Sequence, residues 1–232
     1  MNILKSDNVR GYFIYALGEV LLVVIGILIA VSINNWNEDR KEKAELLSIY
    51  SVVKQDLAND VAEINDILRQ HSQIEPVFNQ ILEDSLSYDD FNKMGLPSFV
   101  ILGYPEISFD QRGFHLLRDF NASNEGNQDS TVVSIIEFYT ERMLEIKVDD
   151  DFRAQDFEDN YIYWKNNHSW WNEYVTMRDF SGFATYATTG SDYKNRVASF
   201  YFLTYQVYLP ELQLFVEQAK ELISDIEKIE TN

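Results

Sequence analysis

The feature that most constrains this chain is an uninterrupted apolar run near its amino terminus. From Tyr12 to Ile33 the sequence reads YFIYALGEVLLVVIGILIAVSI, which is 22 residues with one charged side chain, Glu19. Because a helix rises about 1.5 Å per residue, this run is long enough to cross a hydrocarbon core of about 30 Å. We therefore predict one transmembrane helix over residues 12–33. A cleaved signal peptide, which the Ala30-Val31-Ser32 pattern would allow, is the alternative.

The rest of the chain has the size and charge of one soluble, acidic domain. The chain is 232 residues long, with 19 Lys and Arg against 38 Asp and Glu. Residues 1–43 hold five residues of each sign, so the net charge of -19 lies in residues 44–232. Binding to nucleic acid needs clustered cations, so this composition argues against a nucleic-acid partner. The absence of cysteine excludes disulfides, thiolate metal sites and cysteine nucleophiles.

We predict four consecutive segments: a cytoplasmic tail over residues 1–11, the transmembrane helix over 12–33, a charged juxtamembrane helix over 34–45, and a soluble helical bundle over 46–232. Apolar residues spaced by three and four indicate a helix that continues from the membrane span, namely Leu46, Tyr50, Val53, Leu57, Val61, Ile64 and Leu68. The predicted fold class is mainly α, with one N-terminal transmembrane helix continuing into an antiparallel helical bundle.

Breaker residues and apolar spacing divide the soluble part further. The predicted elements are an irregular crossover over residues 85–107 and helices over 109–120, 130–148 and 152–178. A last helix, which Thr189, Ser191 or Asp192 would cap, carries an apolar stripe from Val197 to Ile229. We expect a helix break near Pro76, and a kink or restart of the last helix at Pro210. The sequence from Ser108 to Gln111 has the form of a capping box for the helix over residues 109–120.

One face of the predicted span collects its small and polar side chains. The members of this stripe are Ala16, Glu19, Val23, Gly26 and Ala30, spaced by three and four. Gly26 and Ala30 form a small-xxx-small pair, which lets two helix backbones approach closely in lipid. A carboxyl group as deep as that of Glu19 costs about 2.5–3.5 kcal/mol unless it is neutralised or paired, so it should face a partner helix or a wet cavity.

We therefore predict that these five residues form a helix-helix interface, either in a homo-oligomer or with another membrane protein. Two alternatives remain for Glu19. In a shifted span its side chain would extend to the membrane surface, and in an oligomer a ring of Glu19 carboxyl groups would conduct protons or cations.

The flanks of the span carry aromatic and basic residues. Tyr12 and Tyr15 at one end and Trp36 at the other are predicted membrane-interface anchors, because their rings favour the headgroup region. The positive charges on the two flanks nearly balance, with Lys5 and Arg10 against Arg40, Lys41 and Lys43. Counting positive charges therefore does not fix the orientation.

The stretch from Tyr15 to Lys41, YALGEVLLVVIGILIAVSINNWNEDRK, resembles a bacterial family of unknown function with a single membrane span. Members share a Gly-Glu pair, an apolar run and Asn-Asn-Trp-Asn-Glu, which here are Gly18, Glu19, Asn34, Asn35, Trp36, Asn37 and Glu38. A looser likeness covers Phe109 to Phe120. The resemblance implies a single-pass protein of the bacterial inner membrane with a cytoplasmic amino terminus and a periplasmic C-terminal domain, although the tail here is shorter and less basic than is usual. It implies no reaction.

Residues suited to catalysis or metal binding are few and scattered. The three histidines, His71, His115 and His168, have no metal-ligand spacing and follow no nucleophile motif. The acidic residues between positions 149 and 159 lack the glycine and the terminal glutamate of a calcium loop, and we interpret them as charges at a helix start. Tyr161, Trp164, Trp171 and Tyr174 share one helical face. Core packing is the expected role of that face, and a ligand pocket is the alternative.

These observations predict no catalytic, cofactor-binding or metal-binding residues. Our first hypothesis is a membrane-anchored, non-enzymatic sensor, scaffold or accessory protein with a periplasmic helical domain, which assembles through its transmembrane helix. The alternative is a subunit of an oligomeric membrane channel or transport complex that uses Glu19 within the membrane. An enzyme is a third class. The expected partners are the lipid bilayer and a second copy of the chain or another membrane protein.

Overall fold

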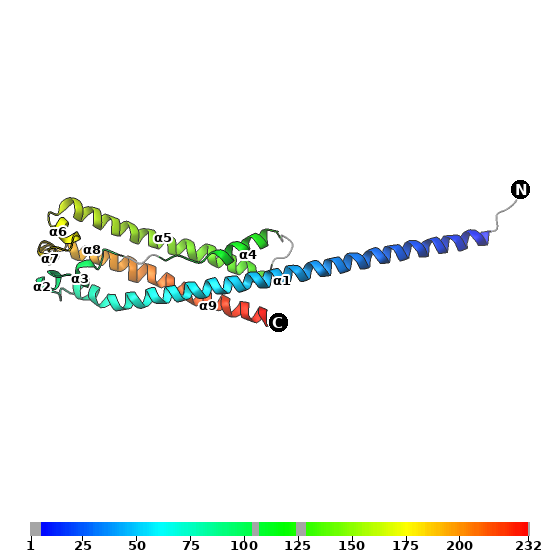
Figure 1. Ribbon diagram of the computed structural model, residues 1–232, viewed down its shortest axis with the longest axis horizontal. Helices are drawn as coiled ribbons and strands as arrows, with labels where there is room; N and C mark the ends of the chain where they lie inside the picture. The colour runs from blue at the N-terminus through cyan, green and yellow to red at the C-terminus, as the bar shows by residue number, and fades with distance from the viewer. Residues whose placement is uncertain (1–5, 104–106, 124–128, 232) are drawn as a thin grey trace. The chain divides into compact units, whose positions relative to one another are not determined.

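The computed structural model describes residues 6–103, 107–123 and 129–231, and the regular elements in these ranges are all helices (Figure 1). They are α1 (Ser6–Leu82), α2 (Tyr88–Phe91), α3 (Leu96–Phe99), α4 (Arg112–Ser123), α5 (Ser130–Asn167), α6 (Trp171–Val175), α7 (Ser181–Thr188), α8 (Asp192–Tyr201), the π-helix η1 (Phe202–Tyr208) and α9 (Leu209–Glu230). The prediction of a mainly α fold is confirmed. The chain divides into two units, Met1–Ile49 and Tyr50–Asn232.

The described part of the first unit is a single helical stretch, the amino-terminal part of α1. Every side chain from Gly11 to Trp36 is exposed, including a long series of Leu, Ile and Val. By its length and composition, α1 is able to cross a membrane over this series. Such a helix suits lipid, because its backbone polar groups are bonded within the helix and its apolar side chains face outward.

In the second unit, residues 50–82 of α1 lie against the continuous helical run α8–η1–α9. The pairing is antiparallel: near the start of this stretch Lys54 forms an ion pair with Glu230, and just beyond its end Asp84 pairs with Lys194. The buried face of α1 includes Tyr50, Val53, Leu57 and Ile64, which are fully buried. These four belong to the stripe predicted from the sequence.

Helix α5 also packs antiparallel to the run α8–η1–α9. Arg142 near the start of α5 pairs with Glu211, and Asn160 near its end accepts a hydrogen bond from Arg196. Since α1 and α5 are both antiparallel to the same run, they point in the same direction. Two helices that point the same way cannot be joined by a short turn, so the chain returns along the unit between them.

That returning segment is the crossover predicted over residues 85–107. Residues 104–106, which include Pro105, lie outside the described part of the chain. The crossover contains the short helices α2 and α3. It ends at α4, which begins at Arg112 and not at Phe109 as predicted. The capping box expected at Ser108 to Gln111 therefore does not open this helix.

The predicted break near Pro76 is wrong, because α1 continues through Pro76 to Leu82. Proline within a helix removes one hydrogen bond and costs about 3 kcal/mol. Here residues on both sides of it are held by packing: His71 lies before it and Phe78 and Ile81 follow it, and all three are buried. Burial of these side chains offsets the cost of the proline.

The predicted break at Asp149, Asp150 and Asp151 is also wrong. Helix α5 runs through all three residues and ends at Asn167, so the expected helix over 152–178 is divided between α5 and α6. Cations on the same helix stabilise the aspartates, because Asp150 pairs with Arg153 and Asp151 with Lys147, three and four residues away. The acidic cluster therefore does not mark a helix start.

Pro210 changes the last long helix in an unexpected way. The turn before it widens into the π-helix η1, in which the N–H of Leu209 donates to the carbonyl of Thr204, five residues earlier. A wider turn avoids the clash that a proline ring makes with the carbonyl four residues before it. The apolar stripe predicted from Val197 to Ile229 faces the core: Val197, Thr204, Tyr208, Leu212, Phe215, Ala219 and Ile226 are buried.

The start of α4 touches the backbone of α1. A methyl group placed at Gly113 would lie 2.6 Å from the Cα of Val53 and 2.7 Å from its nitrogen. These are backbone atoms inside a packed helix, so they cannot move aside as the tip of a flexible side chain would. Glycine at position 113 is required by this close approach.

We predict that Gly113→Ala destabilises the chain by about 1–3 kcal/mol, the usual cost of overpacking a core. In an open helix the same change would stabilise by about 0.5–1 kcal/mol, so the sign of the effect reports the contact. Denaturant unfolding of the full chain in detergent, followed by circular dichroism, measures it. Gly103→Ala is the control, because an added methyl there meets no atom within 4 Å. If both variants behave alike, the close contact is wrong.

Candidate functional site

The interface residues predicted in the membrane span all lie on α1 and are exposed. Ala16, Glu19 and Val23 line one shallow groove, together with Val20 and Val24. Gly26 and Ala30 continue the same face of the helix, because they follow Val23 by three and seven residues. A methyl group added at Gly26 would meet no atom within 4 Å.

Glu19 is the only charged side chain between Gly11 and Trp36. Its carboxylate is exposed and makes no hydrogen bond or ion pair within the described residues. In water an exposed carboxylate needs no partner, but in hydrocarbon it does. If this segment crosses a bilayer, the partner of Glu19 has to come from outside this helix.

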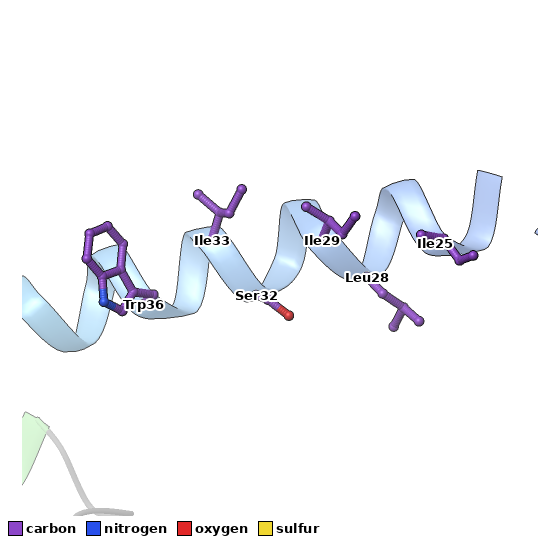
Figure 2. A pocket seen from close by; sticks show the side chains of 6 residues that line it. All are labelled: Ile25, Leu28, Ile29, Ser32, Ile33 and Trp36. Carbon is purple, nitrogen blue, oxygen red and sulfur yellow. The ribbon is translucent and has the colours of Figure 1, made fainter. Parts of the chain in front are cut away.

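A second face of the same segment is apolar and ends in the predicted anchor Trp36. Figure 2 shows its six side chains, Ile25, Leu28, Ile29, Ser32, Ile33 and Trp36, projecting from a single helix. The guanidinium of Arg40 lies 5.6 Å from the Trp36 ring, a cation-π distance. An aromatic ring with a cation at the end of an apolar helix is the arrangement found at membrane surfaces. Tyr12 and Tyr15, the anchors predicted at the other end, are also exposed.

In the second unit, two buried carboxylates of α1 hold the start of α4. The N–H of Asp110 donates to Asp60 Oδ1 over 2.9 Å, and the N–H of Gly113 donates to Asp56 Oδ2 over 2.6 Å. Asp56 and Asp60 are one turn apart and therefore share a face. The first N–H groups of a helix have no partner within it and form its positive end, which a carboxylate stabilises. The capping groups come from α1, not from Ser108 as predicted.

The second oxygen of Asp60 is buried and has no hydrogen-bond partner in the described part of the chain. Burial raises the pKa of Asp60 to about 7, and the negative charges of Asp110, Asp56 and Glu63 act in the same direction, against the hydrogen bond from Asp110. Tyr139 of α5, fully buried, lies near these carboxylates, and burial raises its pKa well above the usual range. This site binds or releases one proton near neutral pH.

A second buried polar group joins α5 to η1. Arg153 is fully buried, and its guanidinium lies 4.0 Å from the ring of Tyr208 and donates to Asp150 over 2.9 Å. Its Nε donates to Thr204 Oγ1 over 3.4 Å. Thr204 and Tyr208 both belong to η1, so the widened turn presents two side chains to one cation. π-Helices of this kind are frequent at functional sites.

The three histidines lie on different elements, and none forms a catalytic pair within the described residues. His71 is buried on α1, and burial together with the charge of Arg153 lowers its pKa to about 4, so it is neutral at pH 7. Its ring nitrogens have no hydrogen-bond partner in that part of the chain. His168 stacks on Trp170 with ring centroids 4.9 Å apart, whereas His115 is exposed on α4.

The aromatic face predicted in one helix is built from two. Tyr161 and Trp164 lie on α5, and Trp171 and Tyr174 lie on α6. The rings still meet, with centroids 5.1 Å apart for Tyr161 and Trp171 and 6.2 Å apart for Trp164 and Tyr174. Trp164 and Tyr174 are fully buried. The expectation of core packing is confirmed for Trp164, Trp171 and Tyr174, whereas Tyr161 is 38% exposed.

The acidic residues between positions 149 and 159 do not gather into a metal site. No group of three or more His, Cys, Asp or Glu side chains able to hold a metal ion occurs among the described residues. Asp156 instead accepts hydrogen bonds from Ser199 and Asn160. Asp156 thus joins α5 to α8.

Sequence reasoning missed the most distinctive polar sites of the second unit. Asp56 and Asp60 sit between the apolar positions Val53, Leu57 and Ile64, where acidic residues usually face solvent. Their spacing of four residues on a strongly apolar helix was the available signal. The sequence does not show which groups these carboxylates bind, because the start of α4 is more than 50 residues away.

We predict that Asp60 makes the chain less stable as the pH rises from about 4 to about 7, whereas His71, whose pKa is lowered from 6.5 to about 4 in the folded chain, acts in the opposite direction. The pKa of Asp60 is 3.8 in its ordinary state and about 7 in the folded chain, so the folded state holds a proton that the unfolded state has lost. The stabilisation is complete below pH 4 and is lost as the pH passes 7. Chemical unfolding of the full chain across this range measures it.

Asp60→Asn should remove that pH dependence and make the chain more stable than the wild type at pH 8. The amide oxygen still accepts the N–H of Asp110 but carries no charge. Asp90→Asn is the control, because hydrogen bonds from Ser87 lower the pKa of Asp90 to about 2, outside the tested range. A wild-type slope that persists in Asp60→Asn would rule out Asp60 as its source.

Comparison with known proteins finds one similarity. Residues 19–100, which are 82 of the 232 residues, match a family of unknown function, DUF6090. The matched region begins at Glu19 and contains Trp36, Asp56, Asp60 and His71. No curated protein and no solved structure matches the chain. The expected likeness to a family of unknown function is thus supported over about a third of the chain, while the bacterial source and the Asn-Asn-Trp-Asn-Glu motif stay predictions.

Proposed function

We propose that this protein is a membrane-anchored, non-enzymatic assembly module. Residues 12–33 cross the membrane and bind a second transmembrane helix, in another copy of the chain or in another membrane protein. The acidic second unit acts outside the cytoplasm as a sensor or scaffold. The observation that carries the proposal is Glu19, an ionisable side chain with no partner within its own apolar helix.

The stripe of Ala16, Glu19, Val23, Gly26 and Ala30 supports helix association. Gly26 and Ala30 leave space for a neighbouring backbone, which increases van der Waals contact where no hydrophobic effect operates. Glu19 on the same face gains a hydrogen bond from that neighbour. A carboxyl group that stayed unpaired in the membrane would cost about 2.5–3.5 kcal/mol. One hydrogen bond between helices recovers about 0.6–2 kcal/mol of that cost.

The non-enzymatic part of the proposal is supported by the polar groups of the second unit. Asp56 accepts a backbone N–H of α4, Asp60 accepts that of Asp110 just before α4, and Arg153 binds Asp150 and η1. His71 is buried and neutral at pH 7. Each of these groups has a role in joining helices, which is what a scaffold requires.

The proposed orientation places the short amino-terminal tail in the cytoplasm and the second unit in the periplasm of a bacterial cell. It is supported by the resemblance of Tyr15 to Lys41 to single-span proteins with that arrangement.

We predict that Gly26→Cys and Ala30→Cys form disulfide-linked products in membranes when an oxidant is added. The chain has no cysteine of its own, so each variant reports a single position. Leu21→Cys and Leu28→Cys are matched controls, because they lie on the opposite face of α1. Gel electrophoresis under non-reducing conditions measures the products. Equal yields at all four positions, or only monomer at all four, would contradict a self-association face at Gly26 and Ala30.

The same cross-linking assay measures how much Glu19 contributes to helix association. Glu19→Leu should weaken association about 3- to 30-fold, the range expected for one hydrogen bond between helices in lipid. Glu19→Gln should retain most of it, because the amide still donates and accepts. A Leu variant that associates as well as the wild type would remove Glu19 from the interface.

The second candidate function is a channel or transport subunit, and one observation favours it. Glu19 lines a groove with Ala16, Val20, Val23 and Val24, so a ring of copies would place several carboxyl groups around one axis. Ion flux through reconstituted protein that is lost in Glu19→Gln would favour this function. Intact assembly without flux would favour the anchor.

A further inference from the structure

A cavity of about 280 Å³ lies at one end of the second unit, where α1 ends and α8 begins. Its lining residues are Ile81, Asp84, Leu86, Phe91, Ala187, Thr188, Gly190 and Lys194. They come from the end of α1, the following turn, α2, the end of α7 and the start of α8. The volume is at the lower end of the range for small-molecule sites, so it suits a ligand of a few heavy atoms.

Two opposite charges stand together at this cavity. Lys194 Nζ lies 2.6 Å from Asp84 Oδ2, and the side chain of Asp84 is 78% exposed while that of Lys194 is 35% exposed. An exposed ion pair contributes little stability, because each partner is nearly as well solvated when separated. The pair can therefore open, so that each charge binds a group of a ligand instead.

The backbone holds Asp84 at this position. Asp84 has a φ of 56°, in the left-handed region, and the end of α1 closes with Ser85 N–H donating to the Gln80 carbonyl and Asp84 N–H donating to the Ile81 carbonyl. These two bonds form a Schellman motif, in which glycine or asparagine is usual at the left-handed position. An aspartate there places a negative charge at the cavity where glycine would place none.

The remaining walls combine apolar and polar groups. Ile81 and Phe91 are buried in the hydrophobic cluster at this end of the unit, and the small side chain of Ala187 leaves its side of the cavity open. The hydroxyl of Thr188 donates to the Ala184 carbonyl, which leaves its oxygen free to accept a hydrogen bond. A complementary ligand therefore carries adjacent positive and negative groups and a short apolar portion.

We propose that this cavity binds a free α-amino acid with a small aliphatic side chain. Its carboxylate pairs with Lys194, its ammonium group pairs with Asp84 and the oxygen of Thr188, and its side chain lies against Ile81 and Phe91. One molecule of this class carries both charges on neighbouring groups, so neither Lys194 nor Asp84 is left unpaired. The proposal does not depend on how the transmembrane helix associates.

Isothermal titration of the full chain in detergent with L-alanine, L-valine and L-leucine tests the proposal. We expect saturable binding of at least one of them. For the one that binds best, the analogue lacking the amino group and the analogue lacking the carboxylate should each bind about 10- to 100-fold more weakly, because each loses one charged pair. Binding by none of the three, or equal binding of a singly charged analogue, would overturn it.

Three variants test whether the amino acid binds at this cavity. Lys194→Met and Asp84→Asn each remove one charge, and asparagine tolerates the left-handed backbone of position 84. Ala187→Leu fills the cavity without changing any charge. All three should weaken binding at least tenfold while thermal unfolding shows a folded chain. The control is Lys228→Met, which breaks the exposed pair with Asp225 and should leave affinity unchanged. Undiminished binding in all three cavity variants would overturn the assignment.

Discussion

The docking of α4 against α1 determines how the second unit is connected. Because α1 and α5 point in the same direction, the chain has to return along the unit before α5 can begin, and the returning segment has to be held. Asp56 and Asp60 hold it by accepting the N–H groups of Gly113 and Asp110 at the start of α4. Gly113 allows this helix to reach the backbone of α1 at Val53. The contact thus brings together the carboxylates of α1, the start of α4 and a glycine that has no side chain to keep the two backbones apart.

A second contact, between α5 and η1, also depends on several features at once. Pro210 would disrupt a regular α-helix, and the chain accommodates it by widening the preceding turn into η1. That widened turn brings Thr204 and Tyr208 to the guanidinium of Arg153, a buried cation that needs polar partners and an aromatic face. The proline and the buried arginine are therefore two parts of one structural solution, and neither would be expected alone in a helical core.

The parts of the fold that could be predicted are those governed by local periodicity. The apolar run from Tyr12 to Ile33 and the stripe from Val197 to Ile229 follow from spacing alone, since a helix repeats every 3.6 residues. One error arose where a distant residue decides a local outcome. Pro76 does not end α1, because His71, Phe78 and Ile81 are buried by other helices. The error at Asp149 to Asp151 has a different, local reason: Lys147 and Arg153, four and three residues away on α5, pair with two of these aspartates.

The same limit applies to the candidate sites. The face containing Glu19, Gly26 and Ala30 is a property of one helix, so its members could be identified from the sequence. The cavity beside Lys194 and Asp84 could not be identified, because these residues are 110 positions apart and meet only when α8 returns to the end of α1. Asp84 is also hidden by its position: in sequence it is one of several polar residues after a helix, and its left-handed backbone becomes evident only in the folded chain.

Glu19 and Asp60 show how one physical constraint leads to two different roles. Both are carboxyl groups among apolar residues, and both need a partner when water is excluded. Asp60 finds one within its own chain, the N–H of Asp110, and so it holds the segment that leads into α4. Glu19 lies on an exposed face of α1, with no partner in the described residues. In a membrane, Glu19 therefore has to find its partner in another molecule. The same kind of carboxyl group would have a structural role in the core of a bundle.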